Sequence, residues 1–313
     1  MPLPRSDGPL FIVLNAGSGG QDAAQTRERI AALLDAAGRA HRFLPAEGAG
    51  VVEAARQAVE LARREQGVVV AAGGDGTINA VAQATIGAGL PFAVLPQGTF
   101  NYFGRQHGIP QETDAAVQAL LGAELQPVQA GLVNDRLFLV NASLGLYPKL
   151  LEDRETYKKQ LGRSRAVALL AGLVTLLRER RQLDLCIEQD GTELCLRTPT
   201  LFIANNRLQL EQIGIPEAPA LEAGRLVAVM LKPIGWLRML GLLLRGALGR
   251  LGEAETVTSF CLRSLTVRPL RQRRIKVATD GEVFTMHTPL RFRVAPQPLL
   301  LMVPRAEDRA EAA

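Results

Sequence analysis

Lysine is scarce in this sequence of 313 residues, and it is absent from the first 148 positions. Only five of the 36 basic residues are lysines, and the first of them is Lys149. A P-loop that ends in a Gly-Lys pair is therefore excluded from the first half of the chain. A phosphate site there has to rely on glycine-rich backbone and on the start of a helix.

A strong excess of one charge is also missing. The 36 basic residues face 31 acidic ones, which gives a formal net charge of +5. This modest surplus suits an anionic substrate or an anionic membrane surface, and by itself it does not indicate nucleic acid. We therefore expect no nucleic-acid partner.

Cysteine occurs only three times, at positions 186, 195 and 261. An odd number of cysteines without metal-ligand spacing indicates a reducing compartment. The pair Asp190-Gly191 predicts a two-residue hairpin turn, which would place Cys186 directly opposite Cys195. A cross-strand disulfide is then geometrically allowed, but we expect two reduced cysteines in a cytosolic protein.

Long uninterrupted apolar runs are absent as well. The longest stretch without charge, residues 76–104, contains Pro91, Pro96 and Asn101 and is too polar and broken for a bilayer span. The first nine residues carry Arg5 and lack the apolar core of a signal peptide. We expect a cytoplasmic protein.

The two halves of the chain have different patterns. Up to about residue 130, apolar runs typical of buried strands alternate with segments of helical periodicity, which predicts a parallel α/β sheet. From about residue 131, short strand patterns separated by turns predict a sandwich or barrel. The strands expected in the first half are residues 10–14, 68–72 and 92–95, and the helices are 21–37, 49–64, 77–86 and 113–121. The strands expected in the second half are residues 137–142, 183–188, 193–197, 200–205, 225–232, 259–267, 274–279 and 290–294.

Two segments of helical pattern, residues 166–177 and 233–251, interrupt the second half. Neither is long enough to span a bilayer. The second contains Trp236 among leucines and arginines, a pattern shared by interfacial membrane helices and by helices packed on a sandwich with their arginines in solvent. We favour the packed helix.

The strongest chemical signal is the run from Gly73 to Thr77, Gly-Gly-Asp-Gly-Thr, which lies between an expected strand and an expected helix. Small glycines allow a phosphate to approach the backbone, and the N–H groups of the helix start then face it. An aspartate in such a loop suits a metal ion or a base. The alternative is an ordinary turn in which Asp75 caps the helix.

Two further polar loops follow strands of the same predicted sheet. The loop after residue 95 contains Gly98, Thr99, Asn101 and the fixed cation Arg105, and the loop after residue 14 is Asn-Ala-Gly-Ser-Gly-Gly. The carboxyl ends of parallel strands meet at one edge of a sheet, so the three loops together predict a polar cradle for a nucleotide.

The order Asn15, Gly-Gly-Asp-Gly-Thr-x-Asn, Gly-Thr-x-Asn and Asp-Gly-Glu resembles the diacylglycerol kinase catalytic-domain family over roughly residues 10–304. This family includes bacterial soluble lipid kinases and sphingosine kinases, and NAD kinases are more distant. The resemblance implies a Rossmann-like nucleotide-binding α/β domain, a β-sandwich lipid-substrate domain and an active site in the cleft between them. We place these domains at residues 1–130 and 131–305, with the segment at about 294–304 packing back on the first.

The resemblance also implies roles for individual residues. Asp75 lies near magnesium and the triphosphate and is a metal ligand, whereas Asp280 is the proposed general base and Glu282 shares its catalytic motif. From the residues alone, we favour a hairpin turn at Asp280-Gly281, because the pair lies between two strand patterns, and the resemblance favours the base. The nucleotide-binding positions are Asn15, Ser18, Gly19, Gly73, Gly74, Asp75, Gly76, Thr77, Gly98, Thr99 and Asn101.

The implied reaction is transfer of the ATP γ-phosphoryl group to a lipid hydroxyl with Mg²⁺, and diacylglycerol is the first candidate. Two departures from the family pattern stand out: Ala80 replaces a glutamate, and the stretch 222–227 keeps only Glu222 where some members hold a structural magnesium. These departures leave open a catalytically impaired nucleotide- or lipid-binding protein, and an NAD kinase is a third reading. A lipid acceptor implies peripheral contact at the inner face of the membrane, and a homodimer is left open.

Overall fold

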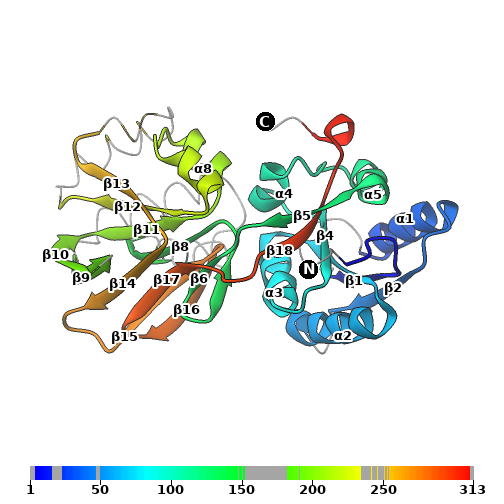
Figure 1. Ribbon diagram of the computed structural model, residues 1–313, viewed down its shortest axis with the longest axis horizontal. Helices are drawn as coiled ribbons and strands as arrows, with labels where there is room; N and C mark the ends of the chain where they lie inside the picture. The colour runs from blue at the N-terminus through cyan, green and yellow to red at the C-terminus, as the bar shows by residue number, and fades with distance from the viewer. Residues whose placement is uncertain are drawn as a thin grey trace, which may run out of the picture. The chain divides into compact units, whose positions relative to one another are not determined.

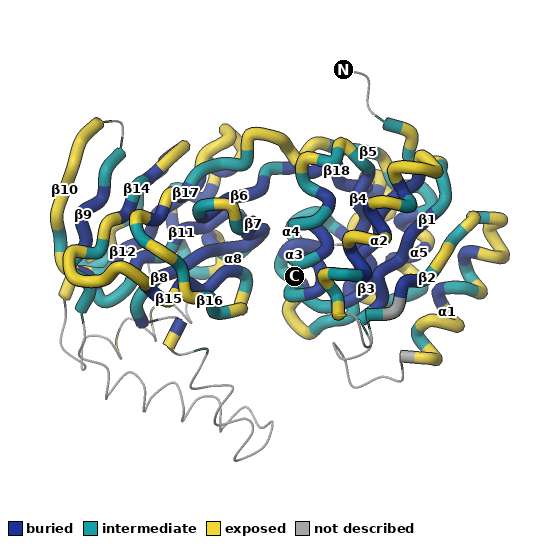
Figure 2. The backbone as a smooth tube through the Cα atoms, turned by 90° about the horizontal axis from the view of Figure 1, so that it is seen from below, coloured by how far each residue is buried: buried dark blue, intermediate teal, exposed yellow. Residues whose placement is uncertain are grey.

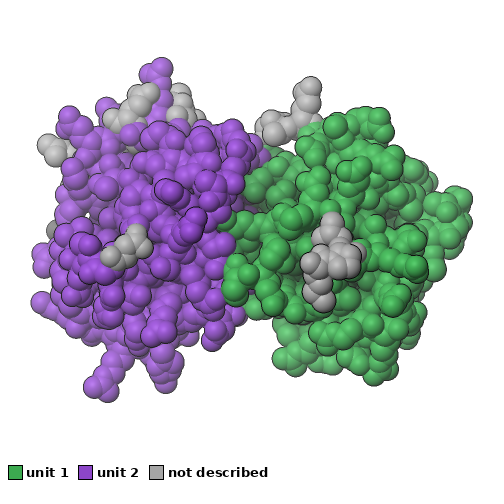
Figure 3. Space-filling model, viewed as in Figure 1, with its two compact units in different colours: residues 1–130, 295–313 green, residues 131–294 purple. Residues whose placement is uncertain are grey.

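The computed structural model describes residues 4–15, 23–46, 50–146, 148–149, 151, 182–189, 191–233, 241, 245, 250, 252 and 254–310. The chain divides into two compact units, Met1–Ala130 with Ala295–Ala313 and Gly131–Val294 (Figure 3). Four residues singled out by the sequence, the expected helix 166–177 and most of 233–251 lie outside the described residues. The four residues are Ser18, Gly19, Asp190 and Trp236.

The first unit is built on a six-stranded sheet with the order β2-β1-β3-β4-β18-β5 (Figure 1). The first five of these strands are parallel, and β5 runs antiparallel to β18. Runs of Val, Ile, Leu and Ala make β1, β3 and β4 buried on both faces, as in other parallel sheets. The strands are β1 (Leu10–Leu14), β2 (His41–Pro45), β3 (Val68–Gly73), β4 (Pro91–Pro96), β5 (Glu124–Val128) and β18 (Leu299–Val303).

Helices cover both faces of this sheet, which confirms the expected α/β domain. On one face, Ile30 of α1 and Val117 of α5 share a core with alternate strand residues such as Leu10 and Ile12. On the other face, α2 packs on β1 and α3 through an alanine-rich stripe, and Figure 2 shows the strands between the helices as buried. The helices are α1 (Ala23–Ala36), α2 (Gly50–Glu65), α3 (Asp75–Thr85), α4 (Tyr102–Gln106) and α5 (Thr113–Gly122).

The second unit contains two antiparallel six-stranded sheets, with the orders β10-β9-β14-β17-β6-β7 and β13-β12-β11-β8-β15-β16. Leu185, Val267 and Phe292 of the first sheet share one core with Leu144 and Leu201 of the second, so the expected β-sandwich is confirmed. The strands of the first sheet are β6 (Gly131–Val133), β7 (Arg136–Phe138), β9 (Leu183–Gln189), β10 (Thr192–Thr198), β14 (Ser264–Pro269) and β17 (Leu290–Val294). Those of the second are β8 (Asn141–Gly145), β11 (Thr200–Ala204), β12 (Leu226–Leu231), β13 (Val257–Leu262), β15 (Arg274–Thr279) and β16 (Glu282–His287).

A short helix and a 3-10 segment cover the outer face of the second sheet. Leu210 of α8 (Arg207–Gln212) and Leu221 of η2 (Ala218–Ala223) join Ala204, Val227 and Val229 in a smaller core. The two elements therefore rest on β11 and β12 beside the main sandwich.

Two expected strands are each split in the structure. The expected strand 259–267 is divided at Arg263 into β13 and β14, because the chain passes from one sheet to the other at that residue. The expected strand 137–142 is divided at Leu139 and Val140 into β7 and β8, because the N–H groups of these two residues bond a side chain instead of a neighbouring strand.

The cysteine pair has the expected register and a different chemical state. Cys186 lies directly opposite Cys195 on β9 and β10, and Gly191 has the positive φ of 80° that a tight turn requires. The structure joins the two cysteines by a disulfide, so the expectation of two reduced thiols is wrong here. Within the described part of the chain, no helix has the length and hydropathy that a membrane crossing requires.

His107 directly follows α4. Its Nε2 atom is buried and has no hydrogen-bond partner among the described residues. Its ring contacts the Phe103 ring edge-on, with 4.8 Å between centroids. Burial, with a smaller contribution from the charge of Arg309, lowers the pKa of His107 to about 4. The imidazole is therefore neutral in the folded protein at neutral pH.

We predict that His107 makes the first unit sensitive to acid. Because the folded pKa lies below the usual 6.5, the unfolded chain binds a proton first, and stability falls as the pH drops from about 6.5 to about 4. The loss from this one residue is up to about 3 kcal/mol. Urea denaturation followed by circular dichroism at pH 7 and pH 4.5 should show a smaller pH effect in His107→Leu than in the wild type. An equal pH effect in both proteins would contradict the assignment.

Candidate active site

The loop after β3 requires glycine for a specific steric reason. A Cβ on Gly73 would come within 2.6 Å of the Thr77 side chain, so no larger residue fits there without displacement. The helix α3 then begins at Asp75, with Gly74 as its N-cap in an extended conformation. The alternative in which Asp75 caps the helix is therefore wrong, and the loop presents the N–H groups of a helix start.

The carboxylate of Asp75 holds the neighbouring loop. Its Oδ2 accepts a hydrogen bond of 3.0 Å from the backbone N of Asn101. Asn101 is only 2% exposed, has a positive φ of 46°, and its side chain bonds both the N–H and the C=O of Gly98. A Cβ on Gly98 would lie 2.8 Å from Cα of Gly74, so the two loops are in close contact.

Asn15 connects the third loop to the same cluster. Its Nδ2 donates to Oγ1 of Thr77 at 2.9 Å, and its backbone N donates to the C=O of Ala72. The structure thus brings Asn15, the 73–77 loop and the 98–101 loop together at the carboxyl ends of β1, β3 and β4. Thr99 lies in this cluster as an exposed residue.

Gln111 and Phe100 lie close to the predicted site residues, and neither was singled out from the sequence. Gln111 accepts a hydrogen bond of 2.6 Å from Nδ2 of Asn101, ten residues earlier in the chain. Phe100 is an exposed aromatic residue whose ring is parallel to that of Tyr102, and Arg105 lies over the same Tyr102 ring. The sequence shows an aromatic residue at position 100 in a polar loop, whereas its exposure and the contact of Gln111 come from the structure.

The described residues of these three loops fit a nucleotide with one divalent ion. Asp75 supplies their only carboxylate, and Mg²⁺ in phosphate-binding sites typically takes one or two carboxylates together with substrate phosphates. The N–H groups at the start of α3 provide the electropositive end of a helix dipole for those phosphates.

Asp280 lies at a hairpin turn in the second unit, as one reading of the sequence predicts. Thr279 pairs with Glu282 across β15 and β16, and both residues of the turn, Asp280 and Gly281, have positive φ. The carboxylate has a further role. It accepts backbone hydrogen bonds from Leu139 at 2.7 Å and from Val140 and Asn141 at 2.9 Å each, which are the bonds that interrupt the expected strand 137–142.

Glu282 lies two residues after Asp280, next to a half-buried cation–aromatic pair. The Arg136 guanidinium is 3.1 Å from the centroid of the Phe284 ring and 3.8 Å from the Glu282 carboxylate. Burial raises the pKa of Glu282, the nearby charge of Asp280 raises it further, and Arg136 opposes both effects. Burial also lowers the pKa of Arg136. Asp280 and Glu282 thus carry carboxyl groups with different surroundings.

Comparison with known proteins shows what the first unit and the whole fold resemble. The model of the diacylglycerol kinase catalytic domain matches residues 9–133. A crystal structure of a diacylglycerol kinase from Bacillus anthracis superposes with a TM-score of 0.69 at 18% identity, over 96% of this chain and 98% of that chain. The resemblance read from the motifs is therefore confirmed, and the structural likeness extends the shared fold to the second unit.

Several curated proteins that match parts of the chain carry the name of lipid kinases. A Pseudomonas aeruginosa protein named "Probable lipid kinase YegS-like" is 45% identical over 108 residues, which cover 34% of this chain and 35% of that protein. A Klebsiella pneumoniae protein of the same name is 31% identical over 159 residues, or 49% of this chain and 52% of that protein. The chain is thus similar to proteins named as YegS-like lipid kinases, and the matches span about a third to a half of their length.

The anchoring role of Asp280 leads to a stability prediction. Replacing Asp280 by alanine leaves three backbone N–H groups without their acceptor, and hydrogen bonds to a charged group are the stronger kind. We expect Asp280→Ala to lower the unfolding free energy of the second unit by roughly 2–4 kcal/mol. Chemical denaturation measures this effect, with Asp135→Ala at an exposed turn as the matched control. A loss of less than about 0.5 kcal/mol would argue against the anchor.

Proposed function

We propose that this protein is an ATP- and Mg²⁺-dependent lipid kinase that transfers the γ-phosphoryl group to a lipid hydroxyl, with diacylglycerol as the first candidate acceptor. The observation that carries the proposal is the contact between Asp75 and Asn101. It joins two glycine loops at the start of α3, where we place the triphosphate and its metal ion. The relationship to lipid kinases supports the acceptor class.

The first unit supplies nucleotide binding in this proposal. Backbone N–H groups of the 73–77 loop hold the phosphates, and Asp75 holds the Mg²⁺, which neutralises phosphate charge when bound. Asn15 and Asn101 fix the loops around them through the hydrogen bonds already described. The complete proposed set is Asn15, Ser18, Gly19, Gly73, Gly74, Asp75, Gly76, Thr77, Gly98, Thr99 and Asn101.

The second unit supplies the acceptor chemistry. The Asp280 carboxylate takes the proton of the lipid hydroxyl as the new O–P bond forms and the bond to the β-phosphate oxygen breaks. Its three backbone donors hold it in a fixed orientation, which favours catalysis because no reorganisation is needed. Glu282 stands beside it as the second acidic group of the motif.

A second candidate is a catalytically impaired binding protein of the same fold. Ala80 stands in α3 where the family has glutamate, and Glu222 is paired with Arg207. Under either function, a lipid ligand requires peripheral contact with a membrane surface, which we place at its cytoplasmic face. A homodimer is compatible with both.

The decisive assay incubates purified protein with γ-labelled ATP, Mg²⁺ and vesicles that contain diacylglycerol, ceramide, sphingosine or phosphatidylglycerol, with NAD as a soluble acceptor. We expect label in one lipid, with diacylglycerol the first candidate. Asp75→Asn should abolish the label because it removes the carboxylate that binds the metal. Asp35→Asn, on the exposed surface of α1, should leave it unchanged.

The remaining outcomes separate the alternatives. Label in NAD would make the protein an NAD kinase. No label in any acceptor, together with thermal stabilisation by ATP and Mg²⁺, would support the impaired binding protein. No label and no stabilisation would contradict the nucleotide site itself.

A further inference from the structure

The segment Leu139–Asn141 is held on both sides by polar groups of the second unit. Its three N–H groups bond the Asp280 carboxylate, and the C=O of Asn141 accepts from the Asp280 backbone N. The C=O of Leu139 accepts from Nδ2 of Asn205, and the C=O of Val140 accepts from the Asn205 backbone N. Every backbone polar group of the segment is therefore paired, and Asp280 is positioned by whatever holds this segment in place.

The side chain of Asn141 extends this arrangement to α8. Its Nδ2 donates a hydrogen bond of 3.1 Å to Oε1 of Gln209. Asn141 is 3% exposed, and its Oδ1 has no partner among the described residues. Within the described part of the chain, the hydrogen bond to Gln209 is thus the contact that fixes the orientation of this buried amide.

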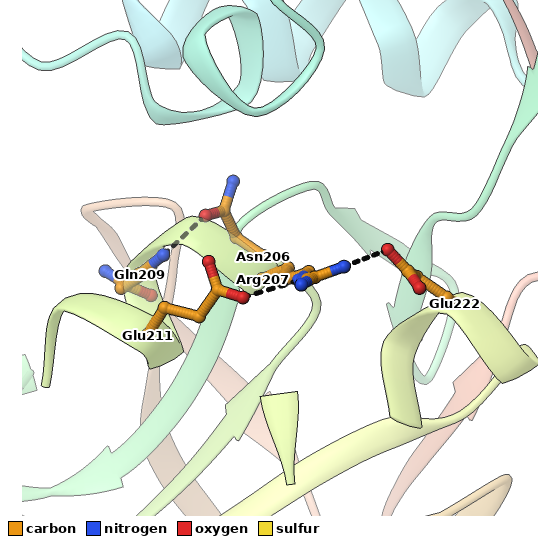
Figure 4. Close-up of polar contacts among 5 residues, drawn as sticks. All are labelled: Asn206, Arg207, Gln209, Glu211 and Glu222. Atoms are coloured by element: carbon orange, nitrogen blue, oxygen red, sulfur yellow. Dashed lines mark hydrogen bonds and ion pairs between the residues drawn. The ribbon is translucent and has the colours of Figure 1, made fainter. Parts of the chain in front are cut away.

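Gln209 is itself fixed at the start of α8. The buried side chain of Asn206 caps the helix by accepting from the backbone N of Gln209 at 2.9 Å. Arg207 donates to Glu211 on the same helix at 2.6 Å and to Glu222 of η2, so its guanidinium ties the two elements together (Figure 4). The position of Gln209 is therefore set by a cap on one side and by an ion-pair clamp on the other.

We propose that Gln209 is a positioning residue for Asp280 and acts through Asn141. The path runs from the clamped helix α8 to the Asn141 amide, then to the backbone N–H groups that bond the Asp280 carboxylate. This inference rests on the proposed function for its effect on catalysis, whereas the coupling between Gln209 and the 139–141 segment stands independently of it. Gln209 touches neither the acceptor nor the nucleotide in this account.

The test removes the acceptor atom and keeps the shape of the side chain. In Gln209→Met, we expect kcat for lipid phosphorylation to fall roughly three- to tenfold, which corresponds to the loss of one partly buried hydrogen bond, with an unchanged KM for ATP. Gln209→Glu keeps an oxygen that accepts from Asn141 and should restore most of the activity. Gln212→Met, at the exposed end of the same helix, is the matched control and should behave as the wild type.

Hydrogen exchange provides a readout that does not need activity. In Gln209→Met, the backbone amides of residues 139–141 should exchange faster while the strands of the main sandwich core keep wild-type rates. Three results would each overturn the proposal. They are wild-type exchange of residues 139–141 in Gln209→Met, a wild-type kcat in Gln209→Met, and an equal loss of kcat in Gln209→Met and Gln209→Glu. If the wild type phosphorylates no lipid, the proposed function fails, and the exchange of residues 139–141 alone then decides whether Gln209 holds the segment.

Discussion

The carboxylate of Asp280 is the group on which the polar architecture of the second unit depends. It collects three backbone N–H groups at the point where β7 ends and β8 begins, and those groups would otherwise be unsatisfied. Asp280 forms the hairpin turn through its backbone, which has a positive φ. Its side chain bonds the backbone of the segment Leu139–Asn141. Under the proposed function, the residue that takes the proton of the acceptor is thus also one that stabilises the fold.

The first unit uses the same device at its own loops. Asp75 accepts the backbone N of Asn101, and Asn101 in turn bonds both backbone groups of Gly98. In each unit, an acidic side chain thus organises backbone from a distant part of the chain before any ligand arrives. Such preorganisation lowers the cost of binding and of charge development, because the polar groups need not rearrange when the ligand enters.

The elements predicted well from the sequence were those with strong periodicity or fully apolar runs, such as β1, β3 and α2. The edge strands β2 and β5 were missed, because the former is His-Arg-Phe-Leu-Pro and the latter contains a proline and a glutamate. The motifs identified the loops around Asn15, Asp75 and Asn101. Gln111, Asn141 and Gln209 could not be found in this way, because their contacts depend on tertiary pairing between segments whose own patterns are unremarkable.

The central claim is that the rigidly held Asp280 carboxylate takes the proton of the acceptor. Single-turnover phosphoryl transfer by Asp280→Asn tests it most directly. The amide oxygen can still accept the bonds from Val140 and Asn141, whereas the bond from Leu139 loses its acceptor, and the amide is a far weaker base. We predict that ATP binding persists, that the fold is retained at the assay temperature, and that the transfer rate falls by roughly a hundredfold or more. A transfer rate equal to that of the wild type would contradict the claim and leave Asp280 as a structural anchor alone.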